Sequence, residues 1–163
     1  MLSCKLVIPH TPKPKESVRI GRHRTYNPSA KGMMRSREYV RSFLTDYALP
    51  LMSGPLLVIT HYRIPAALSS PERKRRPQHL VPHTKRPDGD NLEKLLNDAL
   101  KGVVWDDDAR ISWLLRSKSL TKAREGETVL FVRELEKGKP NYPLLLCDLL
   151  EHIRIESEDE DSE

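Results

Sequence analysis

Cysteine is scarce in this sequence, and its scarcity excludes two kinds of small protein. The 163 residues contain only Cys4 and Cys147, which lie far apart, and neither has a partner at metal-ligand spacing. The sequence therefore predicts no disulfide framework and no zinc site. We expect both side chains to be reduced, buried thiols.

Long hydrophobic runs are missing as well. No apolar stretch approaches the roughly 18 residues that a membrane-spanning helix needs. The apolar run before Pro9 is also too short to be the hydrophobic region of a signal peptide. We therefore expect a soluble protein of the cytoplasm without a membrane partner.

The charge of the chain is unevenly distributed. The whole sequence has 28 Lys and Arg against 23 Asp and Glu, but its last eight residues, ESEDEDSE, hold six acids and no base. Residues 1–155 thus carry 28 bases and 17 acids, a net charge of +11. A body this positive favours an anionic partner, of which nucleic acid is the commonest. The alternative is a basic protein that is merely soluble.

Hydrophobic periodicity predicts one α/β (α+β) domain with a mixed sheet of about four strands and two main helices. We expect it to span residues 1–137, followed by an extension, 138–163, with a disordered acidic tail. A long Pro-rich loop at 65–87 separates the first half of the domain from the second. The expected elements are a strand at 4–8, a basic loop at 11–32, a helix at 31–47, a strand at 54–64, a helix at 90–100, a strand entered directly from Asp108, and its hairpin partner at 127–135.

Acidic residues gather at two points of this basic chain. Asp88 and Asp90 stand at the start of the second helix, where Asp90 is expected to be the N-cap in a capping box with Glu93. Asp106, Asp107 and Asp108 stand at the start of the following strand. Because consecutive elements are usually neighbours in space, we expect the two groups to converge. Carboxylates that converge need a cation between them, and oxygen ligands suit Mg²⁺ or Mn²⁺.

A bland interpretation competes with this metal site. Asp88 can belong to an Asp-Gly turn, Asp90 can cap the helix, and DDD can be a solvated loop. For the D-x-D pattern alone that interpretation is the better one. Lys94, one turn after Asp90, the second acidic group and the basic body together favour the metal site.

The stretch KRPDGDNLEKLLNDALKGVVWDDDARI resembles the signature of the RusA family of Holliday-junction resolvases. The resemblance covers roughly residues 3–135. It implies a small α/β endonuclease that works as a homodimer, depends on Mg²⁺, binds four-way DNA junctions and resolves them by paired nicks. The residues that match the signature are Asp88, Asp90, Asn91, Leu92, Lys94, Asp98, Ala99, Leu100, Gly102, Asp107, Asp108 and Ile111.

The resemblance also implies roles for individual residues. It assigns the metal ligands to Asp88, Asp90 and Asp108, with Asp107 as an alternative to its neighbour, and a catalytic role to Lys94. Strand alternation points Asp107 and Asp108 to opposite sides, so both cannot serve equally. Asn97 stands where the type member has an aromatic residue. The basic residues expected to contact DNA are Arg22, Arg24, Arg73, Lys74, Arg75, Arg76, Lys85 and Arg86.

The sequence therefore predicts a Mg²⁺-dependent endodeoxyribonuclease that acts on four-way junctions in DNA recombination and repair. An inactive relative that only binds DNA structures is the alternative. A metal-dependent transferase that uses D-x-D fits the basic loops poorly.

Overall fold

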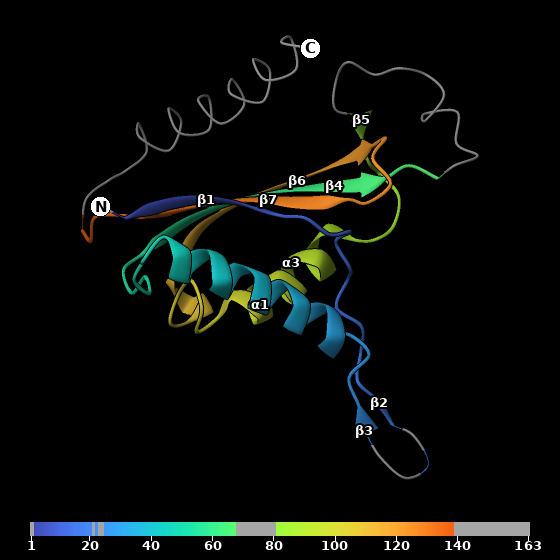
Figure 1. The fold of residues 1–163 in the computed structure, drawn as a ribbon, viewed down its shortest axis with the longest axis horizontal. Helices are drawn as coiled ribbons and strands as arrows, with labels where there is room; N and C mark the ends of the chain where they lie inside the picture. Colours follow the sequence, from blue (N-terminus) through green and yellow to red (C-terminus); the bar gives the residue numbers. More distant parts are fainter. Residues whose placement is uncertain (1, 21, 23–24, 68–80, 139–163) are drawn as a thin grey trace.

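The computed structural model of the chain describes residues 2–20, 22, 25–67 and 81–138. Its main feature is a five-stranded sheet with two helices on one face (Figure 1). The elements are β1 (Ser3–Ile8), β2 (Arg19–Ile20), β3 (Thr25–Tyr26), α1 (Ala30–Asp46), β4 (Leu56–Pro65), β5 (Val81–Pro82), α3 (Gly89–Leu100), the 3₁₀ turn η1 (Asp108–Arg110), β6 (Ile111–Thr121) and β7 (Glu127–Glu134). The predicted fold class, a small mixed sheet with two main helices, is confirmed.

The sheet is ordered β1-β7-β4-β6-β5, and β4 is its central strand. β4 pairs with β6 in parallel and with β7 in antiparallel orientation. The predicted hairpin of β6 and β7 is therefore wrong, because β4 lies between them. The connection between β6 and β7 has only five residues, which suggests that the two strands are direct neighbours. A connection of this length can also cross one intervening strand, since neighbouring strands lie only about 4.8 Å apart.

Gly126 is where this crossing comes closest to β4. A Cβ atom at this position would lie 2.2 Å from the carbonyl oxygen of Arg63, the third-last residue of β4. No side chain could be accommodated so close to a backbone oxygen, so glycine permits the connection to pass over the end of β4.

The core lies between the sheet and the two helices. The helix-facing residues of β4 and the apolar stripe of α3 meet there, and Trp105 is fully buried beside them. Each large side chain removed from water in this way contributes about 1.5–3 kcal/mol. The largest buried members are Leu6, Ile8, Val40, Met52, Leu56, Val58, Tyr62, Leu92, Leu100, Trp105 and Leu130. Cys4 is buried there as predicted, and burial raises the pKa of its thiol to about 11.

Two short pairings were not expected from the sequence. β2 and β3 form a two-stranded ribbon within the expected basic loop, and the ribbon extends away from the sheet and helices (Figure 1). β5 adds two residues to the edge of the sheet beside β6. All three of these strands are too short to give an alternating pattern in sequence.

Among the described helices, none combines the length and apolar character needed to cross a membrane.

Candidate functional site

The start of α3 carries the first acidic cluster, which we define as Asp88 and Asp90. Asp88, rather than Asp90, occupies the N-cap position, and its side chain makes no capping hydrogen bond. Both carboxylates are exposed. The prediction that Asp90 caps the helix is therefore wrong: Asp90 lies in the first turn, where a carboxylate favours the positive end of the helix dipole. The carboxylate of Asp88 has no hydrogen-bond or ion-pair partner among the described residues.

Lys94 lies on the same exposed face of α3, as its spacing predicted. Its Nζ donates to Oδ2 of Asp90 at 3.2 Å. This hydrogen bond lowers the pKa of Asp90, so the carboxylate is ionised at neutral pH. Both side chains are more than half exposed, so the pair itself adds little to stability. A second anion could therefore attract the ammonium without a large loss of folding energy.

Glu93 points the opposite way, into the core, and is 3% exposed. Its Oε2 accepts hydrogen bonds from Thr60 Oγ1 and Tyr62 OH, both at 2.8 Å, while Oε1 has no partner. Burial raises the pKa of Glu93. The predicted capping box is therefore wrong, because the hydroxyls of β4 bind this carboxyl group in the core. The buried contacts fix the rotation of α3 and thereby the direction of Asp90 and Lys94.

Two basic residues of β6 support the turn before α3, and the sequence interpretation missed both. Lys118 Nζ donates to the carbonyl oxygens of Lys85 and Pro87, at 2.9 and 2.8 Å. Arg116 lies against Gly89, where a Cβ atom would be 3.0 Å from its Nε and 3.4 Å from its Cζ. A guanidinium group is thus held next to the residue between the two aspartates. Alternating polar residues in a strand gave no signal for this placement, since a solvated strand edge shows the same pattern.

The second acidic cluster, Asp106 to Asp108, precedes β6. Asp108 is the first residue of η1, and the strand begins only at Ile111, so the prediction that β6 is entered directly from Asp108 is wrong. Asp107 caps η1 by accepting from the backbone N–H of Ala109 at 2.9 Å. The alternation argument for the DDD stretch therefore does not apply.

The three carboxylates of the second cluster differ in their partners. Asp106 binds the Arg110 guanidinium and Asp107 binds Lys101 Nζ at 2.5 Å, and these hydrogen bonds lower the pKa of each carboxyl group. Asp108 accepts from the indole Nε1 of Trp105 at 2.8 Å through Oδ1 alone. Asp108 thus keeps an oxygen for a further ligand, whereas its two neighbours already bind a cation.

The two clusters do not converge within one chain. Lys101, the C-cap of α3, binds Asp107, whereas Asp88 is the N-cap of the same helix. α3 has 12 residues and is therefore about 18 Å long. The length of β6 gives a second estimate of the separation between the clusters. Ile111 begins the strand close to the second cluster, and Arg116, which lies beside Gly89 of the first, is about 16 Å further along it. In the described ranges, no three acidic, histidine or cysteine residues are grouped closely enough to hold a metal ion.

The carboxylate oxygens of the two clusters suit a hard cation, but they are divided between two separate places. Asp88 and Asp90 supply exposed carboxylate oxygens at one end of α3, and Asp108 supplies one at the other end. Mg²⁺ is commonly held by one or two carboxylates together with waters and substrate phosphates. Each half alone is incomplete as an all-protein site.

The expected DNA-contacting residues are only partly within the described ranges. Lys85 and Arg86 are exposed directly before the first acidic cluster, and Arg22 is exposed between the ribbon strands β2 and β3. Arg24 and the four residues Arg73 to Arg76 lie outside the described residues, as does the acidic tail. Two positively charged side chains, Lys85 and Arg86, therefore lie just before Asp88 in the sequence.

Comparison with known families finds a match over most of the chain. The model described as "Endodeoxyribonuclease RusA" matches residues 8–132, which include both acidic clusters, Lys94 and Arg116. A comparison with curated proteins finds no match.

Proposed function

Because the chain belongs to the RusA family of endodeoxyribonucleases, we propose that it is a metal-dependent resolvase that nicks two strands of a four-way DNA junction. Family membership implies endodeoxyribonuclease activity on Holliday junctions. Mg²⁺ as the ion, and Asp88, Asp90, Asp108 and Lys94 as the residues of the site, are our proposals. We place this activity in the cytoplasm, in recombination and repair of DNA.

The observation that carries the proposal is the arrangement at the start of α3. Two exposed carboxylates flank Gly89, against which Arg116 lies, and one of them binds Lys94 on a helix fixed by Glu93. Asp88 and Asp90 would hold a divalent ion there, and the ion would supply activation of water and neutralisation of charge on the leaving oxygen of a phosphodiester. Lys94 is placed to exchange its hydrogen bond with Asp90 for one with a phosphate oxygen, where it stabilises the charge that develops during cleavage.

We further propose that the complete site forms between two copies of the chain. A ligand pair on one Mg²⁺ ion lies within about 4 Å, because each Mg–O distance is about 2.1 Å. The clusters of one chain are several times further apart along α3. A two-fold dimer with antiparallel α3 helices brings Asp88 and Asp90 of one copy to Asp108 of the other, and it creates two such sites. Paired nicks on a junction of near two-fold symmetry need two sites.

The second candidate function is binding to DNA structures without cleavage. The separation of the two clusters within one chain favours it if the chain acts as a monomer. Positive residues beside Asp88 serve binding in either case. The two functions differ in whether the junction is cut.

Cleavage of an end-labelled four-way junction tests the proposal. We expect paired nicks with Mg²⁺ or Mn²⁺, none with EDTA, and none with Asp90→Asn, which keeps the size of the side chain but removes a charged ligand. Asp46→Asn, an exposed carboxylate at the end of α1, is the matched control and should cut normally. Tight junction binding with no cleavage in either metal would overturn the nuclease proposal and establish the binding protein.

A further inference from the structure

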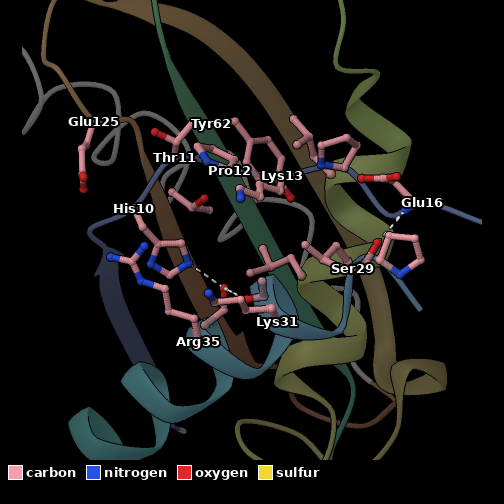
Figure 2. A pocket seen from close by; sticks show the side chains of 18 residues that line it. His10, Thr11, Pro12, Lys13, Glu16, Ser29, Lys31, Arg35, Tyr62 and Glu125 are labelled. Atoms are coloured by element: carbon pink, nitrogen blue, oxygen red, sulfur yellow. Dashed lines mark hydrogen bonds between the residues drawn. The ribbon is translucent and has the colours of Figure 1, made fainter. Parts of the chain in front are cut away.

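A cavity of about 510 Å³ lies between the His10–Glu16 segment, the first two turns of α1 and the apolar side of α3. Figure 2 shows it from close by, with His10, Lys13, Lys31 and Arg35 around it. Its floor includes Tyr62 of β4 and Leu92 of α3. The cavity therefore faces the side of α3 opposite to Lys94.

The cavity carries an excess of positive charge. Lys31 and Arg35 are one helical turn apart on α1, and Lys13 lies on the wall formed by the His10–Glu16 segment. Among the residues that the structure describes, none of the three has an acidic partner within ion-pair distance. Of the two acidic residues that line the cavity, Glu16 is held by Arg19 at 2.9 Å. Glu125 alone is left to offset three cations.

His10 reports this positive environment. Its Nε2 lies 2.8 Å from Ser36 Oγ, at the edge of the cavity. Burial lowers the pKa of His10, and the nearby charges of Arg35 and Lys13 lower it further, while Glu125 opposes them. The contributions of Arg35 and Lys13 show that positive charge faces His10 at this edge of the cavity, and positive charge attracts an anion.

At the N-terminal end of α1, no side chain competes with an anion for the backbone N–H groups. No acidic residue lies in its first turn, and Ser29 makes no side-chain capping hydrogen bond. The hydroxyl of Ser29 instead accepts from the backbone N–H of Glu16 at 2.7 Å. Gly32, which lines the cavity, has no side chain to fill it.

The cavity is connected to the first acidic cluster by a backbone contact. The N–H of Lys15 donates to the carbonyl oxygen of Asn91, the residue after Asp90, at 2.8 Å. The segment that forms one wall of the cavity thus rests on the first turn of α3.

We propose that the cavity binds one backbone phosphate of the DNA substrate through Lys13, Lys31 and Arg35, at a distance from the scissile phosphate. This inference rests on the proposed nuclease function, because it takes DNA as the source of the phosphate. The same three cationic side chains would also suit a free phosphate monoester. Such an anchor holds the strand and steepens the salt dependence of binding without taking part in cleavage.

Salt dependence of junction binding is the first test. The double variant Lys31→Gln/Arg35→Gln should lower the slope of log K against log salt concentration by about 1, as expected for the loss of one phosphate contact. Lys5→Gln/Arg41→Gln removes the same charge from exposed positions outside the cavity and is the matched control. Measurement in Ca²⁺ keeps the junction uncut. Equal slopes for the two double variants would overturn the proposal.

The ring signals of His10 in an NMR spectrum give a second, independent reading. Titration with a dinucleotide that has one phosphodiester and no terminal phosphate should shift these signals and raise the pKa of His10. The shift should be absent in Lys31→Gln/Arg35→Gln and present in the control. A response to inorganic phosphate but not to the phosphodiester would overturn DNA as the occupant and identify a site for monoesters. No response to either would overturn the site itself.

This second reading also separates the inference from the proposed function. A chain that responds to the phosphodiester but fails to cut or bind a junction contradicts the resolvase proposal, while the phosphate site stands. A chain that cuts the junction normally but shows no His10 response contradicts the phosphate site alone.

Discussion

Mixing two inactive variants tests whether the catalytic site is shared between two copies of the chain. Asp90→Asn removes a proposed ligand from the first acidic cluster, and Asp108→Asn removes a proposed ligand from the second. In each variant's own dimer, every shared site lacks one ligand. In the mixed dimer, one site lacks both ligands and the other is complete. Mixing should therefore restore cleavage that neither variant has.

The size of the recovery follows from the geometry. α3 is about 18 Å long, so a single chain does not supply both clusters to one ion. Random pairing makes about half of the dimers mixed, each with one complete site, which gives about a quarter of the parental number of sites. Each mixed dimer has one active site and should leave a nicked junction rather than two resolved duplexes.

The assay is single-turnover cleavage of a labelled junction by chains that carry different tags and are refolded together. Nicked and resolved products separate on native gels. A mixture no more active than its components would refute the shared site, because chains with complete sites of their own cannot complement each other. Full activity of Asp108→Asn alone would equally remove Asp108 from the site.

Three further substitutions address individual side chains. Lys94→Ala should slow single-turnover cleavage by at least about tenfold, or 1.4 kcal/mol, and leave junction affinity nearly unchanged; an unchanged rate would make Lys94 an ordinary partner of Asp90. Arg116→Gln should weaken cleavage more than Arg124→Gln, an exposed control on the β6–β7 connection, and equal rates would exclude a role for Arg116. Because burial raises the pKa of Glu93 above 4.5, its contribution to stability is complete below pH 4.5 and is lost as the pH rises through the folded pKa. Glu93→Gln stays neutral, so denaturant unfolding should show less loss of stability above pH 4.5, and an unchanged pH profile would contradict this account.

Local patterns predicted the individual elements well. The apolar stripe of α3 and the branched residues of β4 each fit a single type of element, and burial of those side chains confirms the pattern. Gly102 ends α3 with a φ of 70°, as a glycine after the last helical turn indicates. These features depend on a few neighbouring residues, so the sequence contains the information needed to predict them.

Pairings between distant segments could not be predicted in the same way. β4 lies between β6 and β7, which therefore do not form a hairpin. This strand order depends on which apolar faces pack together across the whole sheet. The role of Glu93 likewise depends on Thr60 and Tyr62, more than 30 residues away in sequence. A Glu three residues after an Asp indicates a cap only when the core offers it no better partner.

The two acidic clusters show how far the sequence goes toward the site. Spacing correctly places Asp90 and Lys94 on one exposed face, and the resemblance predicts the family that the comparison shows. The rule that consecutive elements are neighbours suggested convergence, but it does not consider the length of the helix between them. Arg116 lies against Gly89, and Lys118 binds the carbonyl oxygens of Lys85 and Pro87, but no local motif marks either residue.

The division of the acids between the ends of α3 links metal binding to dimer formation in the proposed site. Within one chain, Lys94, Arg110 and Lys101 each form an ion pair with a nearby aspartate, so three of the carboxylates already have a positive partner. Bringing Asp88 and Asp90 of one copy to Asp108 of another gathers like charges, which repel unless a cation lies among them. A cation that binds only the assembled site stabilises the dimer by mass action. Ca²⁺ should therefore lower the dimer dissociation constant in sedimentation experiments, and Asp88→Asn/Asp90→Asn should abolish that effect while the metal-free dimer persists or strengthens. A dissociation constant that does not respond to Ca²⁺ in the parental chain would mean that the two clusters do not share an ion.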